Sequence, residues 1–600
     1  MKHIILYSIF ALFTTSLFGQ TVPKGSDARF EEIRKEYVVN DDGSVDFTHY
    51  KRLKLISNRS FFSSFGETFI IYNPEFQQLI INESYTIRPG GSRIETPENA
   101  FNPGLPFSCT DCERYNGMRE MIITHTALEY NAIIVLSYTI RTKPEFVKEF
   151  METIELVESA PISSYTVSIN IPKSKKINYL LLNSDNKPKI SETKGTTYTW
   201  EFENLKQSTI ESYLPNNASL YPILLLSTYK DLAHAYFTLV DQEAFKTYAL
   251  PQSKKLLSEI TNDTLSALNN ALAIRNFVVD NIRLNTINFK YNNFVVAPAT
   301  KTWQSNCGNA IEKTVLLTAL LNEAGFQASP VAFADAKLHN EKIACLNNLE
   351  TFGVRVVING QDFILSAVSK NPTSLERTFG KGFYYILDAT VDSFKAQTIN
   401  PIENTIHIEG NIAFDKDAKA KGILNCNIHS KDTPCFDLIE NQTKAASLIQ
   451  HLKGKVENIK VNENGLQFVY QVENITRDAM GEAYYAFTIP EAKSAFKIKP
   501  ENLPTTRIEP LKCGTTNEKY TYSVNLPEGA KRISKDFEIN MKEAFGELHI
   551  QITLYRNGSI RIDRELKILK DEIAPADYKA FRKMMILWND PITKSIIYKQ

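Results

Sequence analysis

The pattern of apolar and polar positions divides the chain into three regions. From about residue 37 to residue 214, short runs alternate between apolar and polar residues with a period of two, which indicates antiparallel strands. From residue 229 the apolar residues recur at helical spacing, and alternation returns after residue 405. The charged segment 27–37 is predicted to be a short helix, and residues 575–588 an amphipathic one. No internal repeat is visible.

These regions predict an α+β multidomain fold. We expect an N-terminal antiparallel β-sandwich at residues 20–215, a central α+β core at 228–400, and one or more C-terminal β domains at 401–600 that include a terminal helix. A chain of 600 residues is too long for a single core, which agrees with this division. Within the core, Asn359-Gly360 predicts a tight hairpin turn between strands at 352–358 and 362–365.

The first residues are typical of a secretory signal. Lys2 precedes the apolar run 4–13, and the small residue Gly19 stands where cleavage is expected, so residues 1–19 are predicted to be removed on export. The apolar run is too short to span a bilayer, and no other segment reaches that length. The sequence therefore predicts an exported protein that does not span a membrane.

Composition narrows the classes of partner. Apolar residues make up 43% of the chain, and Lys+Arg and Asp+Glu both number 68, so the formal net charge is zero. No Lys/Arg cluster is long enough for a typical nucleic-acid surface, so no nucleic-acid partner is expected. No motif calls for a cofactor.

The seven cysteines are an odd number, so at least one is unpaired within a monomer. Export permits disulfides, and Cys109-Thr110-Asp111-Cys112 predicts a loop disulfide between Cys109 and Cys112. Cys426 and Cys435 are a second candidate pair on neighbouring strands. A zinc site would need a further cysteine pair at suitable spacing, so no metal is predicted.

Cys307 is the candidate nucleophile. It lies in Ser305-Asn306-Cys307-Gly308-Asn309, directly before an apolar run that ends at Gly325 and is expected to be a helix. A helix N-terminus helps to lower the pKa of a thiol, which favours a reactive cysteine. A buried structural cysteine at a helix start is the alternative. Trp303 and Asn306 are expected to line the site if the first interpretation holds.

The motif around Cys307 resembles that of a known family. Cys307-Gly308, the pairs Leu316-Leu317 and Leu320-Leu321, the turn Gly325-Phe326 and the following 328–331 look like the core of the bacterial transglutaminase-like superfamily, which has a papain-like fold. Residues 127–138 resemble a strand of an uncharacterised β domain that often precedes this core in exported proteins of Gram-negative bacteria, and a further β domain commonly follows. The resemblance implies a periplasmic, cell-surface or secreted protein.

The family pattern also requires a histidine and an aspartate. The histidine belongs at the start of the next strand, where this chain has Thr351 or Phe352, and the aspartate position falls at Ser366. Threonine is no base near neutral pH, and serine cannot orient an imidazolium as a carboxylate does. A second register places Asp388 at the aspartate position but still finds no histidine. His339 is the only histidine within reach of Cys307 along this part of the chain.

Two functions are compatible with this motif and its missing residues. The first is a transglutaminase-like protein with an incomplete Cys-His-Asp triad, which binds a peptide, protein or glycan in the cleft of the core without catalysis. The second is an active cysteine peptidase or acyl-transfer enzyme that uses Cys307 with His339 or an unidentified base. The missing histidine and aspartate favour the first, and the intact cysteine favours the second.

Overall fold

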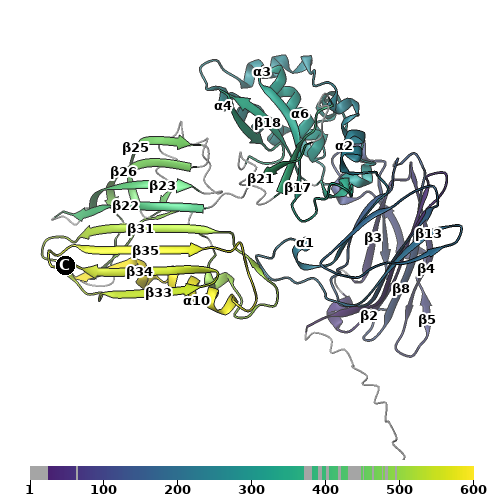
Figure 1. Cartoon of the computed structure of the whole chain (residues 1–600), viewed down its shortest axis with the longest axis horizontal. Coiled ribbons are helices and arrows are strands. Elements are labelled where there is room, and N and C mark those ends of the chain that lie inside the picture. The colour runs from purple at the N-terminus through teal and green to yellow at the C-terminus, as the bar shows by residue number, and fades with distance from the viewer. Residues whose placement is uncertain are drawn as a thin grey trace, which may run out of the picture.

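The computed structural model describes residues 25–61, 65–146, 148–349, 351–370, 382–389, 395–399, 404–415, 420–429, 448–450, 452–462, 465–475, 477–479, 484–493, 496 and 498–599. These residues form a β-rich, multidomain structure with two large sheets, one near each end of the chain, and a helical region between them in sequence. Figure 1 shows the N-terminal sheet in purple and blue, the helical region in teal and the C-terminal sheet in green and yellow.

The large N-terminal sheet has its first strand near the centre. Its order is β12 (Lys189–Glu192), β13 (Gly195–Leu205), β10 (Ile162–Pro172), β1 (Ala28–Val39), β2 (Val45–Leu55), β8 (Ile133–Thr142), β4 (Gln77–Ile87) and β5 (Arg93–Glu95). The pair β1–β10 is parallel, and the other neighbours are antiparallel. Two three-stranded sheets accompany it: β11 (Asn178–Leu182), β14 (Ile223–Ser227) and β9 (Met151–Glu155), and β3 (Glu67–Tyr72), β7 (Arg119–Thr124) and β6 (Phe101–Gly104).

The helix predicted at residues 27–37 is wrong, because this segment is strand β1. A β-bulge between Phe30 and Glu32 interrupts the alternation, so that Phe30, Ile33 and Tyr37 are all buried. The resulting spacing of three and four residues imitates the apolar stripe of a helix. The remaining positions tolerate charges because they are only partly buried or exposed.

The central region packs helices against a five-stranded antiparallel sheet. The helices are α2 (Leu232–Val240), α3 (Lys254–Ile260), α4 (Ala267–Asn281), α5 (Ala299–Ser305) and α6 (Ala310–Glu323), and the sheet order is β19 (Gln361–Leu365), β18 (Thr351–Ile358), β17 (Gln327–Asp335), β20 (Gly382–Ile386) and β21 (Gln397–Ile399). Helix α6 packs against β17 and β18 and shares one apolar core with them. The hairpin predicted at Asn359-Gly360 is confirmed, since both residues have positive φ, 53° and 79°, between β18 and β19.

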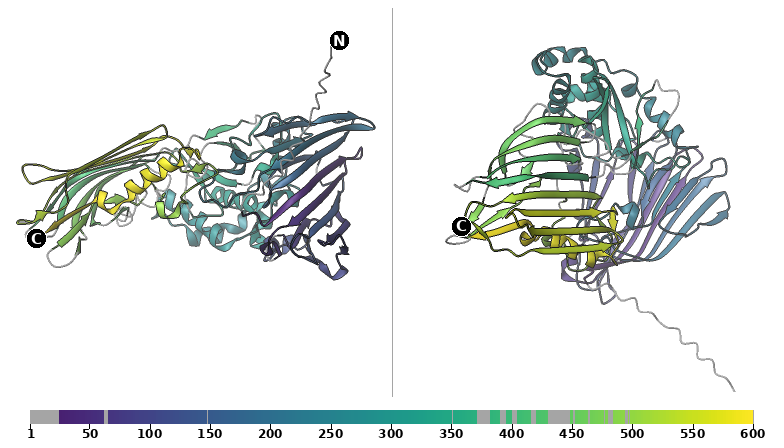
Figure 2. Two further views of the ribbon diagram at one scale, coloured as in Figure 1. Left: turned by 90° about the horizontal axis from the view of Figure 1, so that it is seen from below. Right: turned by 60° about the vertical axis from the view of Figure 1, so that its left-hand side comes forward.

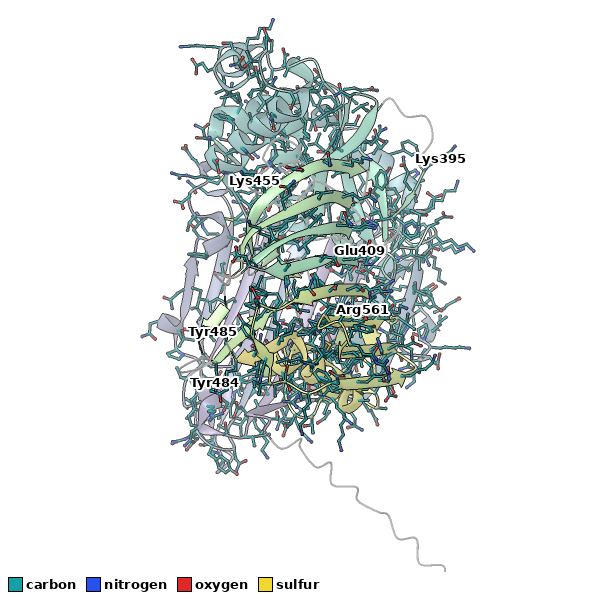
Figure 3. The ribbon with its side chains drawn as sticks, turned by 90° about the vertical axis from the view of Figure 1, so that its left-hand side faces the viewer. Lys395, Glu409, Lys455, Tyr484, Tyr485 and Arg561 are labelled. Atoms are coloured by element: carbon teal, nitrogen blue, oxygen red, sulfur yellow. A yellow bond between two sulfur atoms is a disulfide. The ribbon has the colours of Figure 1, made fainter. Side chains whose placement is uncertain are left out.

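The C-terminal region is a second large sheet with a helix packed on it. The sheet order is β25 (Leu452–Asn462), β26 (Gly465–Ile475), β23 (Ala420–His429), β22 (Asn404–Phe414), β31 (Thr516–Asn525), β35 (Ile560–Ile568), β34 (Gly546–Leu554) and β33 (Phe537–Glu543). Helix α10 (Tyr578–Asn589) buries Phe581, Met584 and Trp588 in the core of this region. Figure 3 views this sheet with Glu409 of β22 and Arg561 of β35 labelled.

The two large sheets share one topology, although the sequence shows no repeat. In each, the first strand lies at the centre, pairs antiparallel with the second, and pairs parallel with a strand that arrives much later in the chain. Strands β1, β2, β4, β8, β10 and β13 correspond in order to β22, β23, β25, β26, β31 and β35. The hairpins also agree in register, since Val39 pairs with Val45 and Phe414 with Ala420.

The segment after β13 binds the C-terminal region. The carboxylate of Glu211 accepts the backbone N–H of Ile508 at 3.0 Å and of Glu509 at 3.1 Å, and it lies 3.6 Å from the buried guanidinium of Arg507. The N–H of Lys512 donates to the carbonyl of Tyr213 at 2.7 Å. Figure 2 shows the helical region between the two large sheets when the molecule is seen from below. Within the described ranges, no helix is long and apolar enough to cross a membrane.

Candidate functional site

Cys307 is held at a short parallel bridge directly before the central helix. It belongs to β16 (Cys307–Gly308), which pairs with β15 (Arg283–Leu284). Asn306 has a positive φ of 51° and turns the chain out of α5, and its carbonyl accepts the N–H of Arg283 at 2.9 Å. A side chain at position 308 would lie 3.0 Å from side-chain atoms of Thr302 and Glu312, so this tight corner favours glycine.

The sulfur of Cys307 is bonded to Cys112 of the N-terminal region. The two Cα atoms are 5.7 Å apart, and 195 residues separate them in sequence. The predicted Cys109–Cys112 disulfide is therefore wrong, and Cys109 is a free, fully buried thiol beside this bond. Burial raises the pKa of the Cys109 thiol, and hydrogen bonds to Ser108 and Asn285 partly oppose that shift. Cys307 itself is only 1% exposed.

The N-terminus of α6 is closed by a buried carboxylate. Asn309 caps the helix and accepts the N–H of Glu312 at 3.0 Å, while Glu312 Oε2 accepts the N–H of Asn309 at 2.9 Å. Tyr115 donates its hydroxyl to the same oxygen at 2.9 Å, and Arg114 forms an ion pair with Oε1. Glu312 is completely buried, so the loop that carries Cys112 supplies the charge partner for the core helix.

A buried lysine follows this glutamate. Lys313 is 1% exposed and donates its ammonium group to the carbonyl of Ile282. Burial lowers the pKa of Lys313 to about 8, with Asp280 acting in the opposite direction. Neither Glu312 nor Lys313 is among the site residues predicted from the sequence. Their signal was available, since two charges stand in an otherwise apolar helix.

His339 is bound in a different environment from Cys307. Its Nδ1 is hydrogen-bonded to the hydroxyl of Tyr385, and its ring lies 4.1 Å from the ring of Phe383 on β20. Burial lowers the pKa of His339, and Glu341 partly offsets that effect. Cys307 packs instead with Cys109, Cys112, Tyr115, Met118, Ile287, Ile71 and Tyr291. No described contact joins the histidine to the sulfur.

The start of β18 packs on the short helix η7 (Phe289–Asn292), which also contacts the cluster around Cys307. The ring of Phe352 packs edge-on against Phe289, at 6.3 Å between centroids, in the short helix η7 (Phe289–Asn292). Tyr291 of the same helix packs against the cluster around Cys307. Thr351 is the first residue of β18 and pairs with Phe333. Neither residue at the start of β18 is a histidine.

The remaining predicted site residues have structural contacts. The hydroxyl of Ser366 accepts the N–H groups of Val368 and Ser369, each at 3.2 Å. Asp388 follows β20 and raises the pKa of Tyr248, for which burial is the larger cause. Trp303 lies 6.2 Å from the ring of Phe277 and packs on the helical core.

The second predicted disulfide has no counterpart among the described residues. Cys426 is a free thiol buried in the core of the C-terminal sheet, where burial raises its pKa. Strand β23 points this side chain inward, between the alternating apolar residues of the sheet. Cys435 lies outside the described residues.

Two segments of the chain match known families. Residues 41–209 match the domain of unknown function DUF3857, and residues 483–598 match the domain of unknown function DUF3858. None of the curated proteins matches this chain. The first match covers most of the N-terminal sheets, including the loop with Cys112, and the second covers the last part of the C-terminal region.

The whole fold is shared with a solved structure. A protein from Parabacteroides distasonis, described as "a putative protease", is 23% identical over 96% of this chain and 99% of its own, with a TM-score of 0.70. The two proteins therefore share a fold across all three regions. A structure from Cytophaga hutchinsonii, described as "a putative cysteine protease", is 13% identical over 55% of this chain and 76% of its own, and its TM-score of 0.17 is too low to carry an argument.

Cys307 thus lies at the start of a buried helix and is covered by another part of the chain. The loop at residues 107–118 binds the helix start at two places, through the Cys112–Cys307 disulfide and through the contacts of Arg114 and Tyr115 with Glu312. A substrate carbonyl could not reach a sulfur that is bonded and 1% exposed.

Proposed function

We propose that this protein is an exported transglutaminase-like scaffold with an incomplete catalytic triad, which binds a peptide, protein or glycan without turning it over. The observation that carries the proposal is the bond between Cys307 and Cys112 beneath a loop that also neutralises Glu312. A nucleophilic cysteine needs a free thiolate and a base, and the described contacts of Cys307 supply neither. Thr351, Phe352 and Ser366 at the family positions support the same conclusion.

The alternative function is an active cysteine peptidase or acyl-transfer enzyme. It is favoured by the position of Cys307 before the buried helix α6, whose N-terminus stabilises a thiolate once the disulfide is reduced. His339 would then have to leave Tyr385 and Phe383 to act as the base. An unidentified base is the other option for this function.

Turnover after release of Cys307 separates the two functions. Hydrolysis of fluorescein-labelled casein and incorporation of monodansylcadaverine into casein are measured for the purified protein, with and without tris(2-carboxyethyl)phosphine. Cys112→Ala releases Cys307 without reductant, and Cys307→Ala is the blank. We expect no turnover above the blank in any form. Activity in reduced protein and in Cys112→Ala, lost in Cys307→Ala, would establish the enzyme, and His339→Ala would then test the base.

The binding half of the proposal has its own test. The protein is immobilised, and a tryptic digest of casein and a mixture of β-glucan oligosaccharides are passed over it. We expect one of the two mixtures to be retained and identified by mass spectrometry. Retention of neither, at protein concentrations of about 100 μM where weak sites fill, would contradict the binding function for those classes.

Export is part of the same proposal. A disulfide between the N-terminal and central regions suits an oxidising compartment, and residues 1–19 have the pattern of a cleaved signal. Intact-mass measurement of protein from the periplasm or medium of a Gram-negative host should show the loss of the first 19 residues or a neighbouring number. Protein that keeps Met1 in that fraction would contradict the signal.

A further inference from the structure

A cavity of about 500 Å³ lies between the N-terminal sheets and the central region. One face of β1, β2 and β8 contributes to its lining, as do β3, β9 and the segment before β9, and the core contributes Lys290, Tyr291, Phe294 and Asn347. Its volume is in the range of sites for small organic molecules. Tyr291 and Ile71 belong both to this lining and to the cluster around Cys307, so the cavity adjoins the disulfide.

A polar row crosses the sheet at the cavity. Lys35 of β1 pairs with His49 of β2, and His49 pairs with Tyr138 of β8, so the three side chains stand side by side on one face. The rings of His49 and Tyr138 are 5.3 Å apart. The next row carries Tyr37 and Phe47, with ring centroids 4.8 Å apart. An ammonium group therefore lies beside a continuous aromatic surface.

The carboxylates that line the cavity already have partners. Glu149 binds Lys175 at 3.0 Å, Glu152 accepts the amide of Asn347 at 3.3 Å and lies 3.8 Å from Lys290, and Glu155 accepts the amide of Asn217 at 2.7 Å. They are bound to neighbours other than Lys35.

Lys35 lacks such a partner. Its ammonium group lies 5.7 Å from the ring centroid of Tyr165, and among the described residues no carboxylate lies within ion-pair distance of it. Burial by itself lowers the pKa of Lys35, but the charge and side-chain hydrogen bond of Tyr165 and the charge of Glu158 raise it above the ordinary value. Glu158 acts on this ammonium group from beyond ion-pair distance, so an anion in the cavity would add a direct counter-ion.

The C-terminal sheet shows which residues the same topology carries at the positions of this row. Its hairpin β22–β23 has the register of β1–β2, and the positions that correspond to Lys35, His49 and Tyr138 are Gly410, Leu424 and Tyr470. Leu424 and Tyr470 are buried in an apolar core. The fold therefore does not require the lysine or the histidine, which points to a ligand as the reason for them.

We propose that the cavity binds a small organic acid, whose anionic group pairs with Lys35 and whose apolar body packs on Tyr37, Phe47 and Tyr138. The cavity is too small for a folded partner, and its aromatic lining suits a ring or an acyl chain. The site is separate from the proposed peptide or glycan cleft of the core, and it requires neither a free Cys307 nor any turnover.

Two dyes that differ in one charged group test the proposal. 8-Anilinonaphthalene-1-sulfonate carries an aromatic body with an anionic group, and N-phenyl-1-naphthylamine is the same body without the sulfonate. Titrations followed by fluorescence should give one saturable site for the anionic dye and weaker binding of the neutral one. Lys35→Met should weaken the anionic dye by roughly tenfold, the size of one charge-assisted bond, and change the neutral dye by less than about twofold.

Two control variants separate loss of the Lys35 charge from loss of the fold. Lys54→Met removes a lysine from the opposite face of β2 and should leave both dyes unchanged. His49→Leu copies the residue found at Leu424 and provides a second variant whose far-ultraviolet circular dichroism should match the wild type. Equal affinity for the two dyes, or undiminished binding of the anionic dye by both folded variants, would overturn the proposal. Because casein turnover and glycan retention are not involved, its failure is distinct from failure of the proposed function.

Discussion

Removing the Cys112–Cys307 bond should destabilise the N-terminal and central regions together. The bond closes a loop of 195 residues, for which the loop-entropy relation gives a stabilisation of about 5 kcal/mol. The double variant Cys112→Ala/Cys307→Ala removes the bond without leaving an unpaired thiol. Cys109→Ala is the matched control, because it makes the same substitution at a buried cysteine of the same cluster and should cost only about 1 kcal/mol.

Urea unfolding followed by tryptophan fluorescence measures this effect. Trp200 lies in β13, Trp303 in α5 and Trp588 in α10, so each region has its own reporter. With a slope of about 3 kcal/mol/M, the double variant should lower the midpoint seen by Trp303 by roughly 1.7 M and leave that of Trp588 nearly unchanged. Reductant should bring the wild type to the midpoint of the double variant. Equal midpoints for the two proteins, or peptide mapping that joins Cys109 to Cys112, would refute the reasoning.

Three further substitutions test other contacts. Glu312→Ala removes the partner of Arg114, Tyr115 and the helix cap, and should lower the free energy of unfolding in urea by about 3 kcal/mol. The double variant with Arg114→Ala should lose less stability than the sum of the two single variants, because the two residues form one ion pair. Burial raises the pKa of Glu518 to about 7 from its ordinary 4.5, so the wild type loses about 3 kcal/mol of stability as pH rises through this window. Glu518→Gln should therefore gain that amount relative to the wild type between pH 4.5 and pH 8, and a difference independent of pH would contradict the assignment. Glu211→Ala should speed limited proteolysis of the segment 206–216, whereas the exposed Glu203→Ala should not.

Local sequence patterns were sufficient to predict a helix or a turn where its own residues determine it. The helix after Cys307 was predictable from its apolar run and from Gly325, whose φ of 85° ends the turn after α6. The hairpin at Asn359-Gly360 and the helix at 575–588, observed as Tyr578–Asn589, followed for similar reasons. Strand β1 was not predictable in this way, because its bulge after Phe30 destroys the period-two signal on which strand prediction depends.

The candidate site was only half predictable. Asn309 and Glu312 form a capping box that is visible in the sequence, and Cys307 precedes it. Its covalent partner was not visible, because the spacing of Cys109 and Cys112 suggested a local pair and nothing in the sequence reports that residues 112 and 307 meet in space. The buried Glu312 was the available clue, since a carboxylate inside an apolar helix needs a cation from another part of the chain.

The shared topology of the two large sheets shows which parts of the N-terminal sheet region go beyond that topology. In the C-terminal sheet, β25 and β26 are joined by residues 463–464 alone. In the N-terminal sheet, the corresponding strands β4 and β8 are separated by residues 88–132, which contain β5, β6, β7 and the loop with Cys112, Arg114 and Tyr115. The C-terminal sheet forms with the same topology and without such an insertion. The stability of the sheet therefore does not explain the loop. Its disulfide and its charged contacts are made to Cys307 and to Glu312 of α6, so the loop stabilises the start of the central helix and not the sheet that carries it.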